Sequence, residues 1–279
     1  MIKKILVPVD FSEASENALQ VAAQIARLHN LQIVVVHIVN VGEFQLTARQ
    51  PSGHDSIFEF EYTKRQFELF LDKDYLQGIQ VQPVAKGSLD FSRLGEVANE
   101  CDAGLIIMET HGSTGISDAL LGSHTEQVIR SASCPVLTLK NGTKSIQMRH
   151  AIFACDFKLE NLGVYMKAMD LFRTLDLTVE QIYVNQAAER FKSTTQINAT
   201  IRKFASKLNE GYALAPEDVV RYSDYTAEKG ILNYARHANA DIIAIPTQGK
   251  SWLSHLFEGS LSESLANNAN LPVITFKIQ

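Results

Sequence analysis

The chain has 279 residues, of which 46% are hydrophobic and 20% are charged, and its formal net charge is −5 at pH 7. This composition is typical of a globular protein with a sizeable core, and the length accommodates two ordinary domains. No run of lysine and arginine supplies the electrostatic attraction that drives nucleic-acid binding, so we expect no nucleic-acid partner. No apolar stretch approaches the roughly 18 residues of a membrane span. The three cysteines are scattered and form no metal-ligand pair, which indicates reduced thiols and a cytoplasmic location.

Short apolar runs alternate with helical periodicity along the first half of the chain. Runs rich in valine, isoleucine and leucine predict buried strands at Ile2–Val9, Leu31–Val39, Val81–Ala85, Gly104–Met108 and Val136–Leu139. Apolar residues at helical spacing predict helices near Ala18–Leu28 and at Phe58–Leu76, Leu89–Asn99 and Ser123–Ser131. Such an alternation of strand and helix predicts a parallel sheet with right-handed crossovers and helices on both faces.

The chain carries this pattern twice. Near the start of each half, Lys3–Phe11 (KKILVPVDF) matches Arg149–Phe157 (RHAIFACDF). Further on, Leu105–Gly112 (LIIMETHG) matches Ile242–Gly249 (IIAIPTQG), and the offset between the two copies is smaller there. The first copy is therefore longer, and the extra residues fall in an extended loop predicted at Gly42–Asp55.

We therefore predict two tandem domains, at residues 1–142 and 148–279, with the polar stretch Asn141–Gln147 (NGTKSIQ) as the linker. Each is expected to be a doubly wound, Rossmann-like α/β domain with an open five-stranded parallel sheet and helices on both faces.

The candidate site lies at one edge of the first predicted sheet. Ligands of open parallel sheets bind outside the carboxyl ends of the strands, where the strand order reverses. Asp10 follows the first strand, Val39 ends the second, and a loop containing glycines follows the fourth. Glycine lets the backbone approach a ligand closely, and a helix N-terminus suits an anion. The candidate binding residues are Pro8, Val9, Asp10, Val39, Met108, Glu109, His111, Gly112, Gly122, Ser123, His124 and Thr125.

The aspartate after the first strand and the spaced glycines resemble the universal stress protein family, whose nucleotide-binding members carry G-x2-G-x9-G-[ST] after the fourth strand. The resemblance covers each half of the chain once. It implies an adenine nucleotide alpha-hydrolase-like fold that binds ATP or AMP, with Mg²⁺. By position, Asp10 and Val39 would hold the nucleoside, and Met108 and His111 would line the pocket. The residues that the resemblance places on the phosphates are Gly112, Gly122, Ser123 and Thr125.

Both copies depart from this motif at its first glycine. Glu109 stands there in the first copy and Pro246 in the second. Proline removes an amide and fixes φ, so we expect the second copy to have lost the nucleotide, although it keeps Asp156. A carboxylate about 4 Å from a phosphate oxygen is repelled by roughly 4 kcal/mol at an effective dielectric of 20, which would disable the first site unless Mg²⁺ bridges the two groups. Alternatively, the Glu109 side chain accepts hydrogen bonds from ribose hydroxyls.

A second hypothesis is a ligand-free interaction module or scaffold, in which Glu109 and Pro246 disable the nucleotide sites. Its halves would pack like a family dimer, through antiparallel pairing of Val136–Leu139 with Val273–Phe276, and two chains could form a homodimer. The simpler interpretation of Asp10 is a cap of the first helix.

Little in the sequence indicates catalysis. It contains no G-x-S-x-G elbow and no HExxH metal motif, so we assign no catalytic residue and no metal ligand. Any ATP hydrolysis would be slow and incidental. His37, inside an apolar strand, is interpreted as a satisfied core histidine.

Overall fold

A computed structural model describes residues 2–39, 54–87, 91–110, 123–247 and 271–278. The described residues fall into two compact units, which divide between residues 146 and 147.

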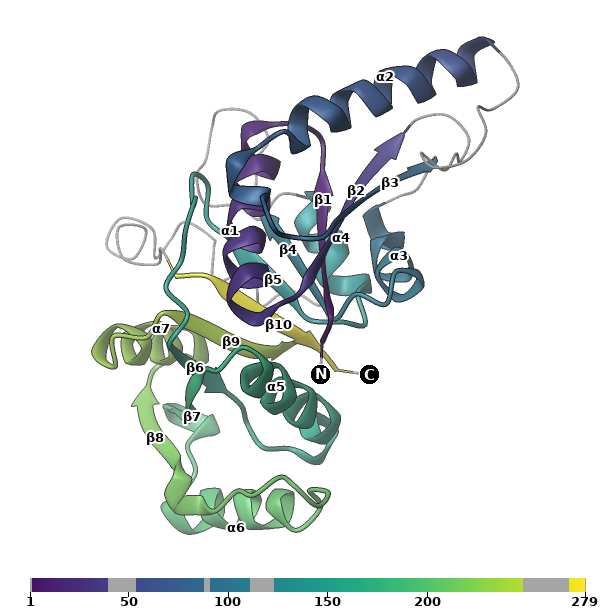
Figure 1. The fold of residues 1–279 in the computed structure, drawn as a ribbon. Helices are drawn as coiled ribbons and strands as arrows, with labels where there is room; N and C mark the ends of the chain where they lie inside the picture. The colour runs from purple at the N-terminus through teal and green to yellow at the C-terminus, as the bar shows by residue number, and fades with distance from the viewer. Residues whose placement is uncertain (1, 40–53, 88–90, 111–122, 248–270, 279) are drawn as a thin grey trace. The chain divides into compact units, whose positions relative to one another are not determined.

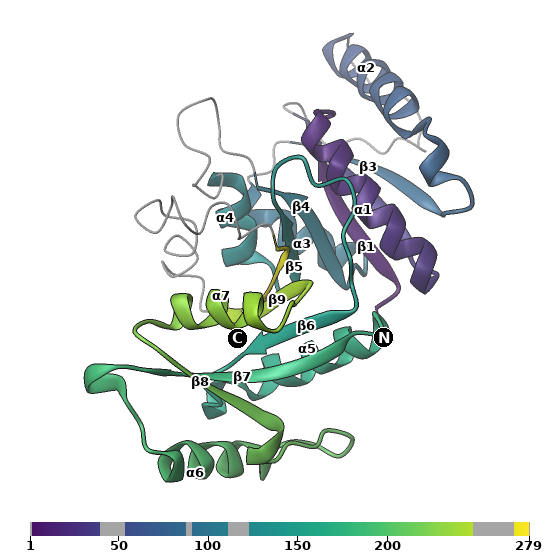
Figure 2. The ribbon, with the colours of Figure 1, turned by 90° about the vertical axis from the view of Figure 1, so that its left-hand side faces the viewer.

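The first unit is an open parallel sheet with the strand order β3-β2-β1-β4-β5 (Figure 1). Its strands are β1 (Lys4–Val9), β2 (Gln32–Val39), β3 (Val81–Gly87), β4 (Leu105–Glu109) and β5 (Val136–Leu139). Its helices are α1 (Glu13–His29), α2 (His54–Leu71), α3 (Leu94–Glu100) and α4 (Ser123–Ser131), with short 3₁₀ turns η1 (Asp74–Leu76) and η2 (Phe91–Arg93). Helices α1 and α2 lie on one face of the sheet, and α3 and α4 lie on the other (Figure 2).

The second unit repeats this arrangement, with the strand order β10-β9-β6-β7-β8 and parallel pairing throughout. Its strands are β6 (His150–Ala154), β7 (Thr178–Gln186), β8 (Val219–Asp224), β9 (Ile242–Thr247) and β10 (Val273–Lys277). Its helices are α5 (Leu162–Thr174), α6 (Thr194–Ala205) and α7 (Ala227–His237), with the 3₁₀ turns η3 (Leu159–Asn161), η4 (Ala188–Arg190) and η5 (Pro216–Asp218). The predicted fold class, two doubly wound domains with five parallel strands each, is confirmed.

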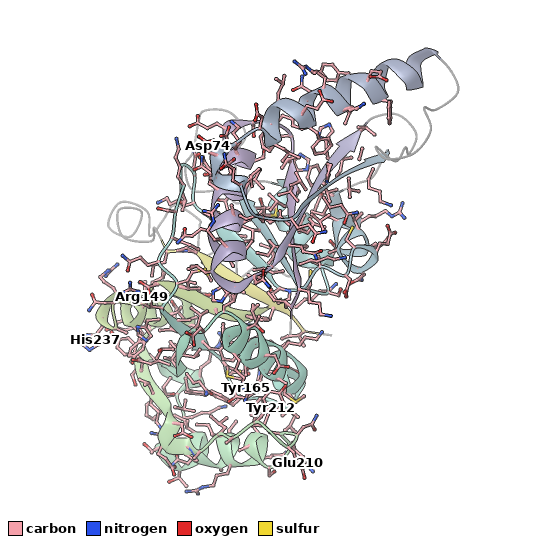
Figure 3. All side chains as sticks on the ribbon, viewed as in Figure 1. Asp74, Arg149, Tyr165, Glu210, Tyr212 and His237 are labelled. Atoms are coloured by element: carbon pink, nitrogen blue, oxygen red, sulfur yellow. The ribbon has the colours of Figure 1, made fainter. Side chains whose placement is uncertain are left out.

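The strands at the centre of each sheet are buried on both faces. Ile5, Leu6 and Val7 of β1 are fully buried although neighbouring side chains in a strand point to opposite faces. In the second unit, Tyr165 of α5 lies in the interior, whereas Glu210 lies at the surface (Figure 3). Burial of one aliphatic side chain, such as that of Ile5, contributes about 1.5–3 kcal/mol to the stability of the fold. The central strands therefore hold the loops at their ends in fixed positions.

Left-handed residues mark the duplication in the backbone itself. Phe11 and Phe157, the last residues of the first pair of matched segments, both have positive φ, at 65° and 52°. Asp102 and Asn239, at 56° and 50°, precede the later pair of matched segments by the same number of positions. Non-glycine residues rarely adopt this conformation, so its recurrence at equivalent positions shows that the two units share their turn geometry.

Helix α2 ends earlier than its predicted end at Leu76. The chain leaves the helix at Leu71, and Lys73 adopts extended backbone before the turn η1. The Lys73 ammonium pairs with Glu16 of α1 at 2.7 Å, and the Arg27 guanidinium, also of α1, donates to the carbonyl of Tyr75 at 2.9 Å. Contacts with α1 therefore stabilise a turn where the apolar pattern predicts continued helix.

The predicted linker packs along the first unit, as Figure 2 shows beside α1. We call residues 140–146 the strap. Gly142, with φ of 78°, lies in a turn in which the Thr143 amide donates to the Lys140 carbonyl at 3.1 Å. Ile146 and the side chain of Gln24 exchange two hydrogen bonds, of 2.7 and 3.2 Å. The strap is therefore bound to α1 where the sequence predicts only a polar connection.

Candidate functional site

The carboxyl ends of β1, β2 and β4 form the edge at which the strand order of the first sheet reverses. Val9 at the end of β1 lies opposite His37 of β2. The Nδ1 atom of His37 lies 2.8 Å from the Val9 carbonyl oxygen, and because a carbonyl only accepts, this nitrogen must carry the proton. His37 is thus a half-buried, hydrogen-bonded histidine, in agreement with the sequence interpretation.

Asp10 follows β1 and is exposed at this edge. Its Oδ1 accepts hydrogen bonds from both the amide and the hydroxyl of Ser12. Ser12 in turn caps α1, because its hydroxyl oxygen accepts from the amide of Ser15 at 3.3 Å. Partial burial raises the pKa of Asp10, but the hydrogen bonds from Ser12 outweigh it and hold the pKa of this carboxyl below its usual range. Asp10 therefore orients the cap, and its charge lies at the sheet edge at neutral pH.

Phe11 gives the Asp10 turn its shape. Its ring packs at 4.4 Å from the ring of His37 and at 5.2 and 5.5 Å from those of Phe67 and Phe70 on α2. A left-handed backbone is unfavourable for a bulky residue, so the packing of this ring must hold it there. The half-buried ring of Phe11 therefore anchors the turn directly beside the exposed carboxylate of Asp10.

The remaining apolar candidates lie in the strands. Val39 is 1% exposed and packs with Phe60 of α2 and Ala85 of β3, so its side chain belongs to the core. Val9 and Met108 are likewise buried. Pro8 is half-buried and lies within β1, in register with Val36 of β2. These residues could offer a ligand their backbone groups and a buried floor.

Glu109 points to the strap. It is 6% exposed at the end of β4, and its carboxylate accepts a hydrogen bond from the amide of Gly142. The next residue, Thr110, donates both its amide and its hydroxyl to the carbonyl of Leu139, at 2.8 and 3.0 Å. The partner of Glu109 is thus neither of the groups expected from the sequence, a phosphate or a ribose, but the strap. No sequence signal could have found it, because the partner is a backbone amide 33 residues away.

The first turn of α4 binds the end of β4. Thr125 is 2% exposed, and its hydroxyl donates to the Glu109 carbonyl at 3.5 Å. His124 is exposed, and its ring stacks on that of Phe91 at 4.0 Å between centroids. Ser123 begins the helix. Three further candidates lie outside the described residues: His111, Gly112 and Gly122.

In the second unit, the equivalent aspartate, Asp156, binds neighbouring residues of its own loop. The Oδ1 of Asp156 accepts from the side-chain amide of Asn161 at 2.7 Å and from the backbone amide of Lys158 at 3.1 Å. Its Oδ2 lies 2.9 Å from the Lys158 ammonium. This hydrogen bond, with the charge of Asp156, raises the pKa of Lys158. The carboxylate of Asp156 therefore pairs with a cation of its own loop, whereas the hydrogen bonds to Asp10 in the described part of the chain come from the uncharged Ser12.

The strand ends of the second unit are also altered. Asn185 stands where the first copy has Val39, and its side chain binds the backbone amide and carbonyl of Lys192 at 3.0 and 2.9 Å. Pro246 lies inside β9, in register with Phe276 of β10. A proline there cannot donate a backbone hydrogen bond to a ligand.

The described residues hold no cluster of three or more histidine, cysteine, aspartate or glutamate side chains that could bind a metal ion. Among the helices that the structure describes, none has the length and apolar character needed to cross a membrane.

Comparison with known proteins gives one consistent family. The model of the universal stress protein family matches residues 1–140 and again residues 148–277. Universal stress protein MJ0577 of Methanocaldococcus jannaschii is 29% identical over 155 residues, which cover 50% of this chain and 96% of that protein. Universal stress protein Mb2028c of Mycobacterium bovis is 23% identical over 290 residues, which cover 97% of this chain and 95% of that protein.

A solved universal stress protein from Archaeoglobus fulgidus has the same fold. The two structures align over 99% of this chain and 96% of that protein's chain, with a TM-score of 0.65 at 19% sequence identity. The family model matches both halves of the chain, and each half folds into the same doubly wound unit. The chain therefore belongs to the universal stress protein family and carries the family domain twice.

Proposed function

We propose that this protein is a cytoplasmic stress-response regulator that binds an adenine nucleotide, ATP or AMP, in its N-terminal domain. The two domains are taken as residues 1–142 and 148–279. The observation that carries the proposal is the state of Asp10. Its carboxylate is exposed, its pKa is lowered, and it is held at the point where the strand order reverses.

The nucleoside would lie against the ends of β1 and β2. Asp10 could accept a hydrogen bond from a ribose hydroxyl or from the adenine amine, as acidic residues do in dinucleotide-binding folds. Backbone groups at Val9 and Val39 would contact the base, and Met108 would form part of the floor. This arrangement favours a ligand with hydrogen-bond donors and a flat apolar face.

The phosphates would lie at the N-terminus of α4, where unpaired amides and the helix dipole favour an anion. Ser123, Thr125 and the glycines Gly112 and Gly122 are the proposed contacts, with His111 beside them. Mg²⁺ would arrive with ATP and be held mainly by the phosphates, as is usual for this ion. We assign no hydrolytic activity to this arrangement.

We propose that the C-terminal domain has lost the site. Its aspartate is paired with Lys158 and Asn161, and Pro246 removes a backbone donor from the strand that precedes the equivalent loop. Its proposed role is that of a structural partner of the first domain.

Titration calorimetry with adenosine, AMP, ATP and ATP–Mg²⁺ tests the proposal. Cyclic AMP is included because one universal stress protein has been solved in complex with it. We expect one nucleotide per chain. D10A should weaken binding by roughly 10–100-fold, because a hydrogen bond to a charged group contributes about 1.5–3 kcal/mol. The matched variant D156A alters the equivalent aspartate of the second domain and should leave nucleotide affinity unchanged.

The alternative, a ligand-free interaction module, makes the opposite prediction. Absence of binding heat at millimolar nucleotide, in both the native chain and E109G, would exclude the nucleotide site. Binding that appears only in E109G would show that Glu109 disables it and would favour the interaction module. Equal losses in D10A and D156A would contradict the assignment to the first domain.

A further inference from the structure

The strap begins at the candidate site. Where β4 ends, Thr110 donates two hydrogen bonds to the carbonyl of Leu139, the last residue of β5, and the Glu109 carboxylate accepts one from the amide of Gly142 in the strap. The bond between Glu109 and Gly142 connects the end of β4 to the strap, and the bonds to Leu139 fix the residue from which the strap starts. The position of the Glu109 carboxylate therefore depends on where the strap lies.

The far end of the strap is bound as well. Ile146 is 8% exposed and exchanges two hydrogen bonds with Gln24 on α1. Between the two ends, Lys144 pairs with Glu13 at 3.4 Å, an exposed contact that contributes little. The strap thus has one anchor at β4 and another on α1, so Gly142 is held in place from both sides.

The Gly142 amide also compensates for the burial of the Glu109 carboxylate. A buried carboxylate is costly unless hydrogen bonds compensate for its lost hydration, and a bond from an amide to a carboxylate is among the stronger ones. Glu109 is such a group. Its own carbonyl accepts from Thr125 in the first turn of α4, which is where the phosphates are proposed to lie. A carboxylate released from the strap could therefore approach the phosphates and repel them.

We propose that Gly142 is a positioning residue of the nucleotide site, because its amide holds the Glu109 carboxylate on the strap and away from the phosphates. This inference rests on the proposed nucleotide binding. It explains how an acid can replace the first glycine of the motif without disabling the site. It also makes phosphate affinity depend on whether the strap is docked.

Substitutions at Gly142 test this role. G142P removes the amide, whereas G142N keeps it and tolerates positive φ better than most residues. A Cβ at this position meets nothing within 4 Å, but at φ of +78° both substitutions strain the backbone, and the proline strains it more because its ring fixes φ near −65°. The comparison therefore has to be repeated where the charge of Glu109 is absent. ATP should bind G142P about tenfold more weakly than G142N, a change of ~1.4 kcal/mol, and adenosine should bind both alike because it carries no phosphate.

The charge can be removed separately. E109Q keeps an oxygen that accepts from the Gly142 amide but carries no charge, so it should bind ATP more tightly than the native chain. In the E109Q background, G142P should cause no further loss of ATP affinity relative to G142N. A tenfold loss that persists in this background would show that G142P acts by distorting the turn, and it would overturn the proposal.

Hydrogen exchange of the Gly142 amide provides a readout without ligand. The amide should be protected in the native chain and in E109Q and should exchange faster in E109A. Rapid exchange in the native chain would overturn the inference on its own. If the native chain binds ATP but G142P and G142N bind it equally, the positioning role fails and the proposed function stands. If the native chain binds no nucleotide, both fail, whatever the exchange shows.

Discussion

Two glycines at equivalent helix positions allow a controlled test of the packing between α3 and α4. Gly95 is the second residue of α3 and Gly163 the second residue of α5. A Cβ on Gly95 would lie 2.7 Å from the Cα of Ala132 and 3.1 Å from the carbonyl oxygen of Ser131, and both are backbone atoms that cannot rotate away. A Cβ on Gly163 would meet nothing within 4 Å.

The expected magnitudes follow from these distances. Alanine is favoured over glycine in a helix by up to about 1 kcal/mol, and this gain applies to both positions. Carbon atoms normally pack at ~3.5–4.0 Å, so in G95A the end of α4 must move by roughly 1 Å. Overpacking of this kind costs about 1–3 kcal/mol. We expect G163A to be neutral or stabilised by up to ~1 kcal/mol, and G95A to be less stable than G163A by the overpacking cost.

Urea denaturation measures both changes. With a slope of about 1–3 kcal/mol per molar, a loss of roughly 1–2 kcal/mol in G95A lowers the midpoint by several tenths of a molar or more while the slope stays constant. Because α4 also carries Thr125, G95A provides a sensitive measure of how rigidly this helix is held. A midpoint for G95A equal to that of G163A would refute the packing argument.

Three further results are expected. Burial and a hydrogen bond to Glu180 raise the pKa of Tyr234 to about 12. The stability that the neutral phenol contributes is therefore present below pH 10 and is lost as the pH rises through 12. Thermal unfolding at several pH values should show this loss in the native chain and not in Y234F. Q24A removes both hydrogen bonds to Ile146, so limited proteolysis should cut the strap faster than in the native chain, and an unchanged rate would mean that this anchor contributes little. F11A should lower the free energy of unfolding of the first domain by about 2 kcal/mol, less than for a fully buried phenylalanine because this ring is half-buried, and it should weaken nucleotide binding through Asp10. A stability loss below ~1 kcal/mol would contradict the anchoring role of this ring.

The fold and its duplication could be predicted from the sequence because they depend on local and repeated patterns. Apolar runs such as Leu31–Val39 mark strands that are buried on both faces, and the structure places β2 at nearly the same residues. The two pairs of matched segments indicate two copies, and left-handed residues such as Phe11 and Phe157 recur at corresponding positions. Asp10 could be placed at the sheet edge because a parallel sheet has only one carboxyl edge.

The partners of the polar side chains were decided by tertiary structure alone. Glu109 binds a backbone amide of the strap, and Gln24 binds Ile146, which is 122 residues away. The pairing of Lys158 with Asp156 also depends on how the chain turns after β6. The sequence shows that a buried carboxylate needs a hydrogen-bond partner, but it does not show which group provides it. Hydrogen bonds act over about 3 Å, and distant residues come within that range only when the chain folds.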